Sequence, residues 1–106
     1  MSVFYEVMLE ELDRNLRKQE AFRKELALHP KGYLSVCHID GKPYVYRKWR
    51  EKGKVCSLYI GVNGDEAVKA AEIERAAYLF AQRSLKALKA EEASLRRAIK
   101  SYGSAH

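Results

Sequence analysis

Residues 33–61 read YLSVCHIDGKPYVYRKWREKGKVCSLYIG, and this stretch decides the fold. It is rich in tyrosine, valine and isoleucine, the residue types that favour extended strands. Asp40-Gly41 is a strong two-residue hairpin turn, and Lys52-Gly53 is a weaker one whose glycine can adopt a positive φ. The stretch therefore predicts a three-stranded antiparallel meander, with strands over residues 33–39, 42–50 and 55–61.

The two turns also determine which residues face each other across the strands. They predict that Val36 opposes Val45, that Tyr46 opposes Tyr59, and that Val45 opposes Ile60. One face then collects apolar residues and a single charge, and we expect the helices to cover it: Leu34, Val36, Val45, Arg47, Trp49, Cys56, Leu58 and Ile60. The opposite face, called the tyrosine face below, collects Tyr33, Ser35, Cys37, Tyr44, Tyr46, Lys48, Arg50, Val55, Ser57 and Tyr59.

Residues 3–28 contain no glycine or proline and are rich in good helix formers, which predicts a long first helix. Its apolar residues recur at helical spacing, with a weaker point at Gln19. This stripe consists of Tyr5, Met8, Leu9, Leu12, Leu16, Phe22 and Leu26. Pro30 and Gly32 end the element.

A second long helix is expected over residues 64–102. Asn63 followed by Glu66 resembles a capping box, Asp65 is a competing cap, and Gly103 is a natural stop. Apolar residues follow heptad spacing, interrupted at Glu92: Tyr78, Ala81, Leu85, Leu88, Leu95, Ile99 and Tyr102.

These elements give an α+β fold in a single domain over residues 1–106. A long N-terminal helix is followed by a three-stranded antiparallel β-meander and a long C-terminal helix. The second helix is longer than the sheet can cover. We therefore expect its C-terminal half to pack on the first helix as an antiparallel pair, or on another copy of the protein.

The positive charge of the chain is concentrated in the sheet. The net charge is +6, and residues 31–62 hold seven Lys/Arg against two Asp/Glu, a balance of +5. Tyrosines can stack on bases or contact sugars, and cations neutralise phosphates, so this sheet is a candidate nucleic-acid interface. Its candidate binding residues are Tyr44, Tyr46, Lys48, Arg50, Lys52, Lys54, Ser57 and Tyr59. A purely structural alternative stays open, because cross-strand tyrosine pairs and edge lysines also stabilise sheets.

The segment 32–61 has a distinctive set of residues: Gly32, Leu34, Ile39, Gly41, Lys42, Tyr44, Tyr46, Arg50, Glu51, Lys54, Val55, Ser57, Tyr59, Ile60 and Gly61. This cassette resembles a recurrent pattern in small, mostly uncharacterised proteins of prokaryotes and mobile elements, in which a long charged helix usually follows. In order and composition it is also similar to the arm-type DNA-binding domains of tyrosine integrases. That resemblance implies a sheet that enters the DNA major groove. Small basic proteins of phages and mobile elements also include anti-CRISPR inhibitors.

The residues of catalytic and metal sites are not arranged in a recognisable pattern. Cys37 and Cys56 are expected on opposite faces of the sheet, and the histidines are scattered along the chain. Glu91 and Glu92 are expected on a solvated helix face. We therefore expect no enzymatic activity, no cofactor and no metal. No apolar run approaches the length of about 20 residues that a membrane span needs, and no signal peptide is evident, so a cytoplasmic protein without a membrane partner is expected.

Three functions fit these observations. The first is an accessory or regulatory protein of a phage or mobile element that binds DNA or RNA. The second is an anti-CRISPR-type inhibitor that binds a CRISPR effector or its guide RNA. The third is a self-assembly module that forms a homodimer through the long helices.

Overall fold

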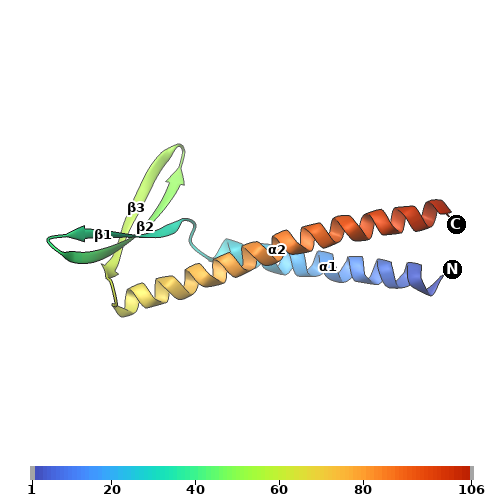
Figure 1. Ribbon diagram of the computed structural model, residues 1–106, viewed down its shortest axis with the longest axis horizontal. Helices are drawn as coiled ribbons and strands as arrows, with labels where there is room; N and C mark the ends of the chain where they lie inside the picture. Colours follow the sequence, from blue (N-terminus) through green and yellow to red (C-terminus); the bar gives the residue numbers. More distant parts are fainter. Residues whose placement is uncertain (1, 106) are drawn as a thin grey trace. The chain divides into compact units, whose positions relative to one another are not determined.

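The computed structural model describes residues 2–105 and contains five elements in sequence order (Figure 1). They are the helix α1 (Val3–Leu28), the strands β1 (Tyr33–Ile39), β2 (Lys42–Glu51) and β3 (Lys54–Val62), and the helix α2 (Glu66–Ala105). This order confirms the predicted α+β class. The chain packs as two compact units, a helical hairpin of residues 2–28 and 80–105 and a sheet unit of residues 29–79. Neither helix is long and apolar enough to cross a membrane within the described part of the chain.

Both hairpin turns have the backbone geometry that two-residue connections favour. Asp40 and Gly41 have φ values of 53° and 78°, and Lys52 and Gly53 have 51° and 78°. Positive φ at both central positions is the type I′ conformation, whose twist matches that of the flanking strands. The strands pair antiparallel in the order β1-β2-β3, with the meander topology that was predicted.

The predicted register is confirmed except near the end of β3. Tyr46 pairs with Tyr59 as expected, but Val45 pairs with Gly61, so the expected pairing of Val45 with Ile60 is wrong. Ile60 is the extra residue of a β-bulge, which a pattern of alternation does not reveal. Because of the bulge, Ile60 still lines the cavity on the helix side of the sheet, together with Ala71 of α2.

Only part of the predicted apolar face is covered. Val45 of β2 and Val68 of α2 are buried, and an ideal Cβ on Gly61 would lie 3.5 Å from a methyl carbon of Val68. However, Val36 is 49% exposed and Leu58 is 48% exposed, so the expectation that helices cover the whole face is wrong for these two residues. A single helix about 10 Å wide covers only a band of a twisted three-stranded sheet.

Of the two caps predicted for the start of α2, the structure confirms the competing one at Asp65, and the end of the helix differs from the prediction. Asp65 is the N-cap, because the helix begins at Glu66 and the Asp65 backbone carbonyl accepts from Val68 N at 3.1 Å. The Asp65 carboxylate accepts from Val62 N at 3.1 Å, which ties the end of β3 to the helix start. The capping box based on Asn63 is therefore wrong. The helix also continues through Gly103 to Ala105, so the predicted stop at Gly103 is wrong as well.

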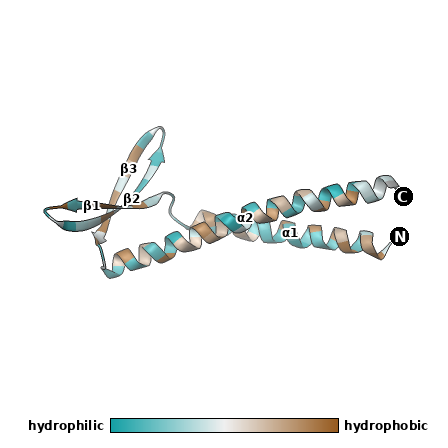
Figure 2. Cartoon of the chain, in the orientation of Figure 1, coloured by the Kyte–Doolittle hydropathy of each residue, from teal (hydrophilic) through white to brown (hydrophobic). Residues whose placement is uncertain are grey.

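The helical hairpin confirms the expected antiparallel pairing within the chain. The Tyr5 and Tyr102 rings stack at a centroid distance of 5.6 Å, and Phe22 meets Phe80 edge-on at 6.1 Å. Hydrophobic and hydrophilic segments alternate along both helices (Figure 2), as expected for amphipathic helices packed along one stripe.

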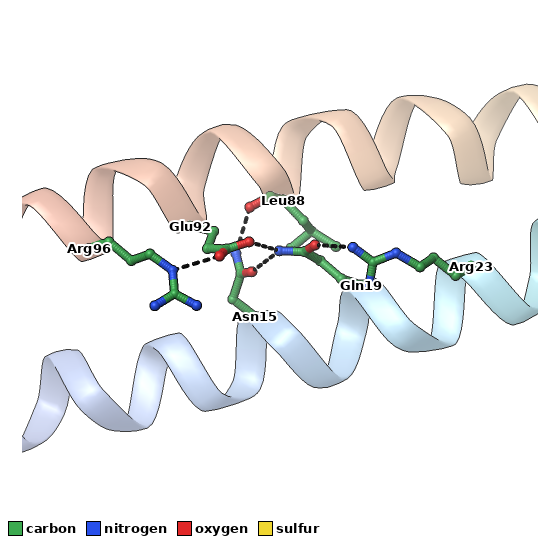
Figure 3. Close-up of polar contacts among 6 residues, drawn as sticks. All are labelled: Asn15, Gln19, Arg23, Leu88, Glu92 and Arg96. Atoms are coloured by element: carbon green, nitrogen blue, oxygen red, sulfur yellow. Dashed lines mark hydrogen bonds and ion pairs between the residues drawn. The ribbon is translucent and has the colours of Figure 1, made fainter.

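A polar layer of Asn15, Gln19 and Glu92 interrupts the apolar stripe of this hairpin (Figure 3). Asn15 and Gln19 are each only 1% exposed. The Asn15 amide donates to the Leu88 carbonyl at 2.9 Å. The Gln19 amide donates to Asn15 Oδ1 at 2.7 Å and to Glu92 Oε1 at 2.8 Å. The predicted solvated position of Glu92 is therefore wrong. The two interruptions seen in the sequence, at Gln19 and Glu92, are hydrogen-bond partners across the helix pair.

The polar layer extends to an arginine at each end. Arg23 donates to Gln19 Oε1 at 2.9 Å, and Arg96 Nε donates to Glu92 Oε2 at 2.6 Å. The hydrogen bond from Gln19, followed by that from Arg96, lowers the pKa of Glu92 below its ordinary value. The layer therefore holds a negative charge whose polar neighbours favour the ionised form.

Candidate nucleic-acid interface

The tyrosine face is assembled around the central strand β2. Residues directly across from each other in a sheet share a face. Tyr46 pairs with Ser35 on one side and with Tyr59 on the other, and Lys48 pairs with Tyr33 and Ser57. Tyr44 pairs with Cys37, and Arg50 pairs with Val55. The strand pairing therefore brings most of the candidate binding residues onto one surface: Tyr44, Tyr46, Lys48, Arg50, Ser57 and Tyr59.

Three tyrosines on this face form a contiguous aromatic cluster, called the tyrosine cluster below: Tyr44, Tyr46 and Tyr59. The Tyr59 ring lies 5.4 Å from the Tyr46 ring at an interplanar angle of 61°, and 6.2 Å from the Tyr44 ring at 50°. Tyr59 is 51% exposed, whereas Tyr44 and Tyr46 are half-buried. Such tilted contacts are favourable for aromatic pairs, so each ring helps to fix the position of the next.

The cations of the site differ in their placement. Lys48 is half-buried between Tyr33 and Ser57, whereas Arg50 is exposed near the end of β2. Lys52 lies in the β2–β3 turn, at the tip of the hairpin. Lys54 pairs with Glu51, and this register places it on the opposite face from Lys48 and Arg50. The tyrosine face therefore has two cations of its own, and Lys52 extends them toward the tip.

Gly32 allows the entry of β1 to lie directly against β2. Its φ is 105°, and an ideal Cβ at this position would lie 2.1 Å from the Lys48 carbonyl oxygen and 2.9 Å from Trp49 Cβ. No side chain fits there. This close approach fixes the backbone of the strand segment that presents Lys48 on the tyrosine face.

A second feature lies on the face opposite the tyrosine face, and it was not predicted from the sequence. Arg47 lies over the Trp49 ring, with Cζ 4.3 Å from the ring centroid, and its guanidinium donates to the Lys31 carbonyl at 3.0 Å. An open groove of about 390 Å³ adjoins this pair and is lined by Pro30, Lys31, Arg47, Trp49, Arg50 and Glu51. The sequence signal was the single charge, Arg47, in an otherwise apolar row. Its stacking on Trp49 explains how that charge is accommodated.

Metal ligands do not converge on this site. Within residues 2–105, no group of three or more His, Cys, Asp or Glu side chains is placed to hold a metal ion. Cys37 and Cys56 are both free, and their partners across the strands, Tyr44 and Trp49, lie on opposite faces, as the predicted register requires.

Comparison with known proteins identifies one family. Its model, described as a domain of unknown function (DUF6788), matches residues 6–70, which is more than half of the chain. The matched region covers most of α1, the whole meander and the first turn of α2, so it includes every candidate binding residue. No curated protein and no solved structure matches the chain. The chain belongs to the DUF6788 family.

Proposed function

We propose that this protein is a non-enzymatic nucleic-acid-binding protein that acts through the tyrosine face. The observation that supports the proposal most directly is the cross-strand row of Lys48 with Tyr33 and Ser57, next to the row of Tyr46 with Tyr59. Cations, hydroxyls and aromatic rings thus share one surface. These are the groups that contact phosphates, sugars and bases.

We propose that the protein has an accessory or regulatory role in a phage or mobile element. This part rests on the resemblance of the cassette over residues 32–61 to small proteins of such elements. The cations, hydroxyls and aromatic rings that the strand pairing gathers on one face suit contact with a nucleic-acid surface, which is why we propose a binding role.

The test is a salt titration of binding to fluorescent DNA and RNA probes. If about three phosphates are neutralised, log K should fall with log salt at a slope of roughly −2.7 for duplex DNA. Lys48→Glu combined with Arg50→Glu should reduce affinity strongly and flatten the slope. The matched control is Lys86→Glu with Lys89→Glu, two exposed lysines of α2 that lie in the helical hairpin unit. The absence of binding at about 50 mM salt would sink the proposal.

A second function, inhibition of a nucleoprotein effector such as a CRISPR complex, is favoured by a different observation. Val36 and Leu58 remain about half exposed on the face that α2 only partly covers. An exposed apolar face on the other side of the sheet from a basic face suits a partner that presents both protein and nucleic acid. Under this function, free nucleic acid would bind weakly. An effector complex would bind tightly, and Val36→Ser with Leu58→Ser would weaken that binding.

A further inference from the structure

We infer that the nucleic acid bound by the tyrosine face is a double helix, contacted through its sugar–phosphate backbone. This inference rests on the proposed function and specifies its substrate. It comes from the mutual geometry of the tyrosine cluster and from the compact arrangement of the cations beside it.

The tyrosine cluster is a poor platform for stacked bases. Proteins that bind single strands offer ring faces on which successive bases stack. Here the Tyr59 ring is tilted by 61° against Tyr46 and by 50° against Tyr44. Neither contact has parallel ring planes, and Tyr44 and Tyr46 are half-buried. Parallel bases therefore could not stack on Tyr59 and on either of its neighbours at the same time.

The polar groups of the tyrosine cluster are its three phenolic hydroxyls. A tyrosine hydroxyl can donate to a phosphate oxygen and accept from a ribose hydroxyl. Ser57 adds a fourth hydroxyl, and Lys48 pairs with Ser57 across the strands. The face thus combines hydroxyl donors with ammonium and guanidinium groups, the types of group that most often contact the sugar–phosphate backbone of nucleic acid.

The cations also suit the charge density of a duplex. Alternate residues on one face of a strand are about 6.7 Å apart, so Lys48, Arg50 and Lys52 lie within about 13 Å along β2 and the following turn. A duplex carries one negative charge per about 1.7 Å of its axis, twice the density of one strand. A compact group of three cations therefore meets more phosphates on a duplex than on an extended single strand.

The experiment compares duplex DNA, duplex RNA and the single strand of each, in one sequence and at one salt concentration. We expect a duplex to bind at least tenfold tighter than its own single strand. The triple variant Tyr44→Phe/Tyr46→Phe/Tyr59→Phe keeps the rings and removes the hydroxyls. It should weaken duplex binding by at least about tenfold, since a hydrogen bond to a charged group is worth about that much. Tyr5→Phe, in the helical hairpin, is the matched control.

The outcomes separate the inference from the proposed function. Tighter binding to a single strand, or unchanged affinity of the phenylalanine variant, would overturn the inference and leave nucleic-acid binding in place. Binding to none of the four probes would overturn the proposed function as well. A thermal melt of each variant shows that the fold is retained, and the preferred duplex identifies DNA or RNA as the target.

Discussion

Lys52 occupies a backbone conformation that lysine seldom adopts. Its φ of 51° lies in the left-handed region, where the side chains of most residues crowd the backbone and asparagine or glycine is preferred. We predict that Lys52→Asn stabilises the protein by about 1 kcal/mol, because the turn geometry is unchanged and the strain is relieved. Urea unfolding followed by circular dichroism measures this change.

The same substitution removes a cation from the hairpin tip, so it should weaken nucleic-acid binding while it stabilises the fold. Asp40→Asn in the other turn is the matched control, since Asp40 has a nearly identical φ of 53° and already tolerates it. That control should change stability little and leave the hairpin-tip cation in place. A Lys52→Asn variant no more stable than the unmodified protein would show that the turn is not strained.

The lowered pKa of Glu92 predicts that the stability of the helical hairpin depends on pH. The hydrogen bond from Gln19 and that from Arg96 lower the pKa of Glu92 below its ordinary value of 4.5. A group with a lowered pKa stabilises the fold at pH values above its ordinary pKa, and this contribution is lost as the pH falls through the lowered value. We predict that Glu92→Gln lowers the melting temperature at pH 7 and that its difference from the unmodified protein shrinks as the pH falls from 5 to 3.

Glu91→Gln is the control for that titration. Glu91 lies next to Glu92 on α2 but is exposed, so the same change of charge should leave the pH dependence of the melting temperature unaltered. Parallel pH profiles for Glu92→Gln and the unmodified protein would mean that Glu92 does not contribute to the acid sensitivity of the fold.

The elements of the sheet could be predicted because local signals determine them. Asp40-Gly41 and Lys52-Gly53 fixed the two turns and, through them, the register of β1 with β2 and of most of β2 with β3. The bulge at Ile60 could not be predicted, because one extra residue leaves the apolar pattern of β3 almost unchanged. The exposure of Val36 and Leu58 depends on how much of the sheet α2 covers, which is a tertiary property.

In the candidate site and in the polar layer, too, the contacts between side chains of different elements could not be predicted from the sequence. The membership of the tyrosine face followed from strand alternation, but the tilt of Tyr59 against its neighbours depends on side-chain packing. Gln19 and Glu92 could only be read as interruptions of two separate stripes. Their contact requires the antiparallel alignment of α1 with α2, and Asn15 gave no apolar signal at all.

At the scale of the whole molecule, the polar layer affects which helix each long helix can pair with, and in which register. In the observed alignment Gln19 hydrogen-bonds Asn15 and Glu92 within one chain. Shifting the helices by one heptad would break the hydrogen bonds from Asn15 to the Leu88 carbonyl and from Gln19 to Glu92, at a cost of about 1–3 kcal/mol for each buried group left unsatisfied. Pairing α2 with α2 of another copy in register would bring two Glu92 carboxylates together. The layer therefore disfavours a parallel, in-register pairing of two α2 helices.

We predict that an apolar layer in place of the polar layer would keep the fold but would no longer select a single helix pairing. Asn15→Leu/Gln19→Leu/Glu92→Leu should raise the urea midpoint, because well-packed apolar residues often replace buried polar networks without loss of stability. It should also allow several alignments and associations of similar energy, because buried polar groups select register and oligomeric state in paired helices. Sedimentation velocity should resolve one species for the unmodified protein and several for the leucine variant. The control is Leu12→Ile, an apolar exchange in the same stripe, which should sediment as the unmodified protein does. A leucine variant that remains a single species of unchanged mass would show that the apolar residues alone select the pairing, and that the polar layer has no part in it.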